Sequence, residues 1–242
     1  MAIKVTRCKD AEAVADRASE LLIEAIAAKP DLVLGLPTGG TMLGVYRRLV
    51  EAFRRGEVSF RRATSVNVDE YVGLSPDHPQ SYASYMREHL FRSVDFDPQR
   101  THIPDGSAAD PEQEARRYEG LIGTLGGLDL LLLGLGGNGH IAFNEPGSSA
   151  ASRTRVVRLT SATLRANRRY FAADHEQPRS AITIGLATIL QARRIVVIAT
   201  GAAKSAAADA MLTGAPVADC PAAVLASHPR VQLLLDDAAG RR

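Results

Sequence analysis

Short apolar runs alternate with amphipathic stretches along the whole chain. The runs at 31–37, 128–136, 193–200 and 231–237 consist mainly of aliphatic residues. Runs of this kind, closed by polar or turn residues, predict strands that are buried on both faces. The stretches between them place apolar residues at helical spacing, so the pattern predicts an α/β fold. We expect a single doubly wound, mostly parallel sheet with helices on both faces.

Some elements carry more detailed expectations. Asp10 is the expected N-cap of an alanine-rich helix that ends before Pro30. Residues 63–70 are expected to form one further strand. A helix over 41–56 is expected to bury one apolar face. The residues predicted for that face are Met42, Leu43, Tyr46, Leu49, Val50 and Phe53.

Three predicted strand ends carry unusual polar residues. They are PTGGT at 37–41, NVDEY at 67–71 and GGNGHIAFNE at 136–145. Ligands of doubly wound sheets bind beyond the carboxyl ends of the strands. We therefore expect these three segments to meet in one site.

The third segment overlaps a G-x-G-x-x-G pattern formed by Gly134, Gly136 and Gly139. In a dinucleotide site a helix follows the third glycine, because the pyrophosphate binds at the helix N-terminus. Here His140 follows at once, and Pro146 would end any helix within two turns. The acidic residue expected about 20 positions later is also missing. The glycines thus predict a sharp turn close to a small ligand, not a dinucleotide site.

Two glycine turns suggest a phosphate on that ligand. Thr38, Gly39, Gly40 and Thr41 lie between a strand and a helix, where backbone N–H groups can bind an anion. The segment TGAAK at 200–204 repeats the arrangement and adds the charge of Lys204. The G-K-[ST] ending of an ATP-binding P-loop is missing.

Candidate acid–base groups stand at the other strand ends. A carboxylate such as Glu145 can orient the imidazole of His140 and raise its basicity. Asp69, in the pair Asp69–Glu70 at a different strand end, would be a separate base. The residues alone therefore predict acid–base chemistry on a phosphorylated metabolite.

The composition and charge of the chain indicate which kinds of binding partner it lacks. The net charge is +2, and the basic cluster at 54–62 lacks the interleaved aromatic residues of a single-strand nucleic-acid surface. The longest apolar run, 128–133, is too short to span a membrane, and no signal peptide is evident. Cys8 and Cys220 alone cannot form a metal site or a disulfide framework. We expect a cytoplasmic enzyme without nucleic-acid or membrane partners.

Beyond these features, the chain resembles the glucosamine-6-phosphate deaminase family over nearly its whole length. Members of this family have a modified Rossmann-like fold without a dinucleotide, and they convert glucosamine 6-phosphate and water to fructose 6-phosphate and ammonia without a cofactor or metal. The resemblance implies one domain over 1–242, with a mobile lid at about 152–180. The matching motifs, in chain order, are LGLPTGGT, NVDEYVGL, HPQSYASYM, GNGHIAFNEP, SRTR and TIGLATIL.

The resemblance also implies roles for individual residues. Asp69 matches the base that moves a proton between carbons 2 and 1 of the sugar. His140 matches the residue that opens the pyranose ring, with Glu145 as its carboxylate partner. Arg169 and Lys204 match phosphate ligands, together with the turn at 38–41.

Some departures and alternatives stay open at this stage. Asn138 stands where some members carry an aspartate beside the histidine, so we expect an active site with a weaker triad. In members of the family that an effector activates, a lysine stands in place of Val157 and the C-terminus is longer. We therefore expect no such activation here. Three alternative functions stay open: a related 6-phosphogluconolactonase, a sugar-phosphate sensor and a galactosamine-6-phosphate isomerase. Tyr71 and the N-E-P ending at 144–146 argue against the lactonase function. The sequence leaves open a monomer or a homo-oligomer.

Overall fold

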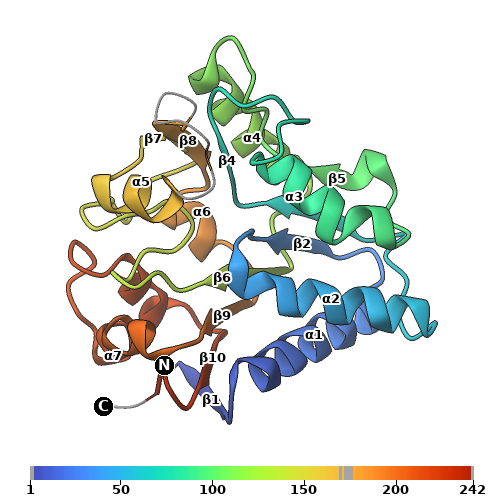
Figure 1. Cartoon of the computed structure of the whole chain (residues 1–242), viewed down its shortest axis with the longest axis horizontal. Coiled ribbons are helices and arrows are strands. Elements are labelled where there is room, and N and C mark those ends of the chain that lie inside the picture. Colours follow the sequence, from blue (N-terminus) through green and yellow to red (C-terminus); the bar gives the residue numbers. More distant parts are fainter. Residues whose placement is uncertain (1–2, 169–170, 172–176, 241–242) are drawn as a thin grey trace.

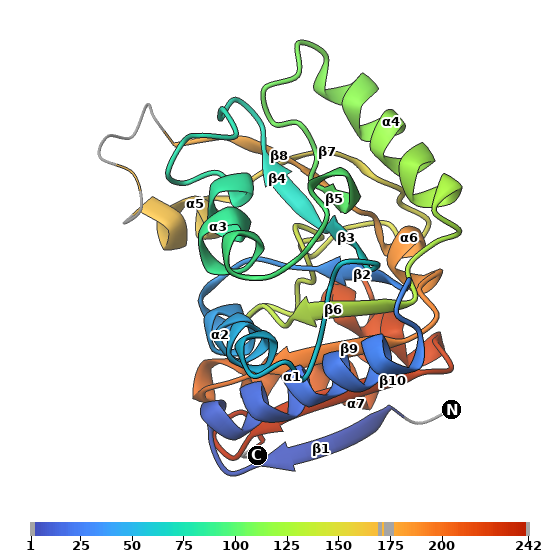
Figure 2. The ribbon, with the colours of Figure 1, turned by 90° about the vertical axis from the view of Figure 1, so that its right-hand side faces the viewer.

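The computed structural model describes residues 3–168, 171 and 177–240. Seven strands form one sheet in the order β1-β10-β9-β6-β2-β3-β5, and every pair is parallel. Figure 2 shows these strands stacked from β1 at the bottom to β3 and β5 near the top. The predicted parallel α/β sheet is confirmed. The strands are β1 (Lys4–Cys8), β2 (Val33–Leu36), β3 (Thr64–Asn67), β5 (Thr101–His102), β6 (Leu130–Gly134), β9 (Ile195–Ala199) and β10 (Val231–Asp236).

Helices cover both faces of the sheet, and each face has its own hydrophobic core. On one face pack α1 (Ala11–Ala28), α2 (Gly40–Arg54) and α3 (Tyr82–His89). On the other pack α4 (Pro111–Thr124), α6 (Leu186–Leu190) and α7 (Ser205–Thr213). Figure 1 shows α1 and α2 to the right of the sheet and α6 and α7 to its left.

A second, three-stranded antiparallel sheet lies above the end of β3. It consists of β4 (Asp69–Tyr71), β8 (Ser180–Thr183) and β7 (Arg155–Arg158), in that order. The prediction of one strand over 63–70 is therefore wrong. The N–H of Val68 bonds to the carbonyl of Leu36 in the main sheet, while its carbonyl accepts from Ile184 beside β8. The chain changes sheets at Val68, which places Asp69 at the junction of the two.

The first two helices test the finer predictions. Asp10 caps α1 as expected, because its side chain accepts a hydrogen bond of 2.8 Å from the N–H of Ala13. The expected face of α2 is partly wrong. Leu43 is 42% exposed and Phe53 is only half-buried, while Val45 is buried in the core. A turn of 3.6 residues carries position 43 away from the stripe of 42, 45, 46 and 49.

The strand order fixes the place of a ligand site. From β2 the chain continues to β3 and β5 on one side, while β6, β9 and β10 follow on the other. The crevice at such a reversal, beyond the carboxyl ends of the strands, is where doubly wound sheets bind ligands. Here it lies between β2 and β6, which lead into the polar segments 37–41 and 136–145. Among the described residues, no helix is long and apolar enough to cross a membrane.

Candidate active site

A pocket of about 600 Å³ opens at this reversal, within the usual size range of small-molecule sites. The three polar segments predicted to meet do so here. Thr38, Gly39 and Gly40 line it after β2, Asp69 after β3, and Gly136 and His140 after β6. Lys204, which follows β9, lines it as well. The wall is completed by aromatic residues of α3, of the strand that carries Asp69 and of the loops: Tyr71, Tyr82, Tyr85, Phe143 and Phe171.

The glycines after β6 make room for the histidine. A Cβ on Gly136 would lie 2.3–2.5 Å from three atoms of the His140 ring, so only glycine lets the imidazole pack against the turn. Gly139 has φ +84°, and a Cβ there would lie 2.5 Å from the sulfur of Cys220. These contacts explain the pattern without a dinucleotide. One glycine receives the imidazole and the other permits the left-handed turn.

Asn138 joins His140 to Glu145. Its Nδ2 donates to Glu145 Oε2 at 2.6 Å, and its Oδ1 lies 2.7 Å from Nδ1 of His140. Because the carboxylate only accepts, the amide must turn its oxygen toward the ring. Nδ1 must then carry the proton that bonds to that oxygen, which leaves Nε2 as the basic nitrogen of the neutral ring.

Asn138, rather than a direct hydrogen bond, joins His140 to its expected carboxylate partner Glu145. Nδ1 and Oε2 are 3.7 Å apart, and the amide of Asn138 bonds to both groups. The pKa of His140 is lowered below its ordinary value mainly by burial, and also by the charge of Lys204, although Glu145 acts in the opposite sense. The imidazole is consequently neutral at pH 7, ready to accept a proton at Nε2.

Asp69 is the second candidate base of the pocket. It is only 5% exposed, and its pKa is raised well above its usual range, first by burial and then by the charge of Glu70. Glu70 points away from the pocket and accepts three backbone N–H bonds of 2.8–2.9 Å, from Tyr71, Tyr82 and Ala83. Burial nevertheless raises the pKa of Glu70 to about 7. Glu70 thus ties the start of α3 to the strand that carries Asp69.

The turn after β2 offers backbone N–H groups to an anion. Gly39, with φ +110°, precedes α2, and no side chain of the described residues caps this helix. The carbonyl of Gly39 accepts from the hydroxyl of Tyr85 at 2.8 Å, which fixes the turn against α3. Lys204 is half-buried, has no ion-pair partner in the described part of the chain, and has its pKa lowered by burial. Arg169, the other expected phosphate ligand, lies outside the described residues.

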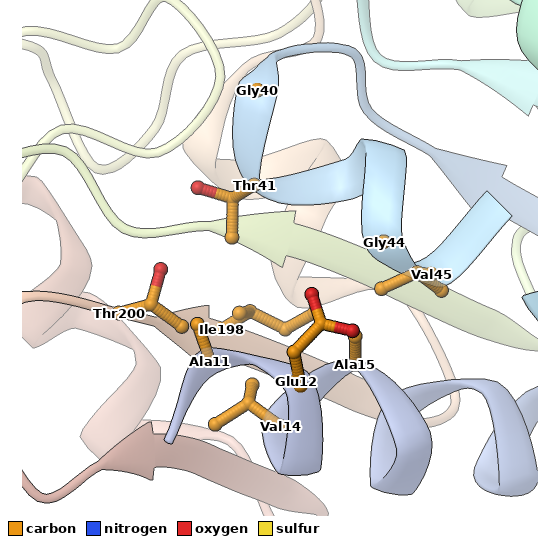
Figure 3. A pocket seen from close by; sticks show the side chains of 10 residues that line it. All are labelled: Ala11, Glu12, Val14, Ala15, Gly40, Thr41, Gly44, Val45, Ile198 and Thr200. Carbon is orange, nitrogen blue, oxygen red and sulfur yellow. The ribbon is translucent and has the colours of Figure 1, made fainter. Parts of the chain in front are cut away.

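Thr41 departs from the expected arrangement. Its side chain lines a separate cavity of about 300 Å³ between α1, α2 and the end of β9. Figure 3 shows this side chain projecting from the first turn of α2 into that cavity, above Thr200. None of the expected acid–base side chains lines the smaller cavity. Of the turn at 38–41, the residues that line the larger pocket are thus Thr38, Gly39 and Gly40.

Comparison with known proteins shows to which family the chain belongs. The profile described as "Glucosamine-6-phosphate isomerases/6-phosphogluconolactonase" matches residues 7–234. Glucosamine-6-phosphate deaminase of Rhodopirellula baltica is 50% identical over 237 residues, covering 98% of this chain and 94% of that protein. The enzyme of the same name from a Geobacillus species is 46% identical over the same shares. The chain belongs to the glucosamine-6-phosphate isomerase/6-phosphogluconolactonase family.

Solved structures of the family agree with this assignment. A monomeric glucosamine-6-phosphate deaminase superposes with a TM-score of 0.95 at 45% identity, over 98% of both chains. The 6-phosphogluconolactonase of Leishmania guyanensis superposes with a TM-score of 0.78 at 24% identity, over 100% of this chain and 98% of the other, which shows the shared fold alone. The expected deaminase resemblance and the fold class are confirmed.

Two polar residues of the family motifs have roles that the sequence did not suggest. Asn144 is fully buried, and its Nδ2 donates to the carbonyls of Ile141 and Ile184 at 3.0 and 2.9 Å. Arg155 donates to Oδ1 of Asn144 at 2.9 Å and contacts Ser148 at 3.4 Å. Val157 packs beside the aromatic wall. The N-E-P ending was the only available signal, and it did not distinguish a structural asparagine from a catalytic one. The expected lack of effector activation stays a prediction.

Among the residues that the structure describes, no group of three or more His, Cys, Asp or Glu side chains is placed to hold a metal ion. The polar groups gathered in this family site are acids, bases and cations instead. They can move protons and bind an anion.

Proposed function

We propose that the chain is a glucosamine-6-phosphate deaminase, which converts glucosamine 6-phosphate and water to fructose 6-phosphate and ammonia. One observation carries the proposal. Asp69 and His140 line the same pocket from different strand ends, and Lys204 and the Gly39 turn line it too. Two separate acid–base groups and an anion site are what this reaction requires. The names of relatives that are 44–50% identical support the same substrate. A cytoplasmic location is part of the proposal.

His140 opens the sugar ring. The closed pyranose has no acidic hydrogen at carbon 2, so the aldehyde must form first. Nε2 takes the proton of the anomeric hydroxyl and delivers it to the ring oxygen as the carbon–oxygen bond breaks. While the imidazole of His140 holds the extra proton, its Nδ1–H donates to Oδ1 of Asn138, and Nδ2 of Asn138 donates to the carboxylate of Glu145. This arrangement stabilises the imidazolium both through the amide and through the carboxylate oxygen that lies 3.7 Å from Nδ1.

Asp69 then moves a proton along the carbon chain. Its carboxylate removes the hydrogen of carbon 2 while the aldehyde oxygen gains the proton that the substrate's ammonium group gives up, which yields an enolamine. Asp69 then returns a proton to carbon 1, which leaves an iminium at carbon 2. The raised pKa of Asp69 makes it a stronger base than an exposed aspartate. Steps of this kind are typically worth about 10² to 10⁴ in rate. Water then adds to carbon 2, and the carbon–nitrogen bond breaks to release ammonia.

The phosphate is assigned to the part of the pocket lined by Lys204 and the turn at Gly39 and Gly40. Lys204 supplies charge, the turn at Gly39 and Gly40 supplies N–H groups, and Arg169 is proposed as a further ligand from the family resemblance. Charge-assisted bonds to phosphate are about twice as strong as neutral ones. A phosphate held there fixes the sugar between Asp69 and His140. We also propose that the segment at 152–180 acts as a lid over the bound sugar.

Product analysis tests the proposed function. The purified chain is incubated separately with glucosamine 6-phosphate, galactosamine 6-phosphate and 6-phosphogluconolactone. Ammonia and fructose 6-phosphate should form in equal amounts from the first substrate, and the lactone should hydrolyse no faster than in buffer. Lactone hydrolysis without ammonia release from either amino sugar would assign the chain to the other branch of the family.

A further inference from the structure

The second carboxylate oxygen of Glu145 is held by the start of α5 (Ser161–Asn167). Oε2 bonds to Asn138, while Oε1 accepts from the hydroxyl of Thr163 at 2.5 Å. The hydroxyl of Thr160 lies 3.5 Å from the same oxygen. The Glu145 side chain is 12% exposed, so these protein donors take the place of most of its water. Two different segments therefore orient the one carboxylate.

The directions of these bonds are fixed by chemistry. A carboxylate only accepts, so the single hydroxyl proton of Thr163 must point to Glu145. Thr163 Oγ1 is then left to accept from Thr160, whose hydroxyl lies 3.1 Å away. Thr160 is also the N-cap of α5, because its Oγ1 accepts from the N–H of Thr163 at 3.2 Å. The hydroxyls thus form a directed chain that ends on Oε1.

The helix that carries Thr163 is fixed to the pocket at its other end. Asn167 lines the pocket and donates to the hydroxyl of Tyr71 at 2.8 Å. Leu164 packs against the cluster that contains Tyr71 and Phe143. Thr163 itself is not among the residues that line the pocket. The contact of its hydroxyl that leads toward the ring-opening residues is the bond to Glu145.

We infer that Thr163 is a positioning residue of the ring-opening site: its hydroxyl orients Glu145, which orients Asn138 and through it the imidazole of His140. The inference rests on the proposed function, in which His140 opens the ring. Valine at position 163 would have nearly the same shape but could not donate to Oε1. The carboxylate would then turn toward other donors and release the amide of Asn138.

Kinetics of matched variants give the first test. Thr163→Val should lower kcat for ammonia release about tenfold, the scale of a lost hydrogen bond to a charged group, with KM changed less than twofold. Thr163→Ser keeps the hydroxyl and should retain at least half of kcat. Thr124→Val is the control, since Thr124 is exposed and bonds only to the backbone of its own helix. Equal kcat in the Val and Ser variants would overturn the inference.

A double-mutant cycle separates positioning from general support of α5. In a Glu145→Gln background, Thr163→Val should have little further effect on kcat, because the group through which it acts is already altered. A second tenfold loss would show that Thr163 acts independently of Glu145, and would also contradict the inference.

An NMR titration of the substrate-free protein measures the pKa of His140 and does not depend on catalytic activity. The charged groups acting on His140 are Glu145, which raises its pKa, and Lys204, which lowers it. Thr163→Val should therefore lower the pKa of His140 in an NMR titration, with His140→Gln used to assign the signal. Thr163→Ser should leave that pKa in place. An unchanged pKa in the valine variant would contradict the inference, while absence of ammonia release by the unmodified chain would contradict the proposed function alone.

Discussion

Asn138 lies between His140 and Glu145 and bonds to both, at 2.7 and 2.6 Å, so the catalytic imidazole receives the influence of the carboxylate through an amide. Asn138→Leu removes both bonds with little change of size. The ring then loses the partner that fixes its tautomer. We expect kcat to fall about 10²-fold, within the range of acid–base assistance, while KM changes little. Steady-state kinetics check this. A variant that keeps more than half of kcat would show that the amide bridge is dispensable.

Gly136→Ala should displace His140. The new methyl would lie 2.3–2.5 Å from the imidazole, which cannot yield without leaving its bond to Asn138. We expect a loss of activity together with about 1–3 kcal/mol of destabilisation in thermal or urea unfolding. Gly120→Ala is the control. It lies in α4 with nothing within 4 Å of the added Cβ, and should stabilise the fold by about 0.5–1 kcal/mol. Full activity in Gly136→Ala would contradict the packing argument.

Lys204→Ala should weaken substrate binding. The lysine lines the pocket, and a bond between charged groups is worth enough to raise KM by about 10- to 100-fold when lost. The matched control is Lys9→Ala, because the Lys9 side chain is 81% exposed and is not part of the pocket lining. Unphosphorylated glucosamine, if turned over at all, should be processed equally by both variants. An unchanged KM for glucosamine 6-phosphate would move the phosphate elsewhere.

The pH dependence of kcat should reflect Asp69. A base must be ionised, and burial beside Glu70 raises the pKa of Asp69 well above its usual range. Activity should therefore be lost on acidification at a pH well above the roughly 3.9 at which a free aspartate titrates. Loss of His140 as a base follows only below its own lowered pKa. Glu70→Gln removes the neighbouring negative charge, which should move the acid limb to lower pH. An acid limb near pH 4 in the unmodified chain would contradict the assignment.

The sequence predicted the parts of the fold that depend on local pattern. The strands β2, β9 and β10 are buried at every position and β6 at every position except Gly134, and such apolar runs identify central strands by themselves. The edge strand β1 was missed because KVTRC has only two apolar residues, and one of them, Val5, is 39% exposed. The small sheet was also missed, since β4 and β8 pair across more than a hundred residues of chain. Only folding brings them together.

The sequence predicted which residues lie in the site better than it predicted the hydrogen bonds between them. Strand-end polarity identified Asp69, His140 and Lys204, because parallel strands bring their ends to one edge. The order His140–Asn138–Glu145 could not be deduced, since it depends on how the segment 136–145 folds. Thr163 gave no sequence signal, because a threonine at this place looks like part of an ordinary helix start.

The most direct measurement of the central claim is turnover of glucosamine 6-phosphate by Asp69→Asn in D₂O, followed by NMR of the product. The unmodified chain should place deuterium at carbon 1 of fructose 6-phosphate, because the proton on Asp69 exchanges with solvent between the two carbons. The asparagine variant keeps the shape but cannot accept a proton, so turnover should fall by at least about 10²-fold with no deuterium incorporated. A correctly folded Asp69→Asn that still deaminates the sugar and labels carbon 1 would contradict the account.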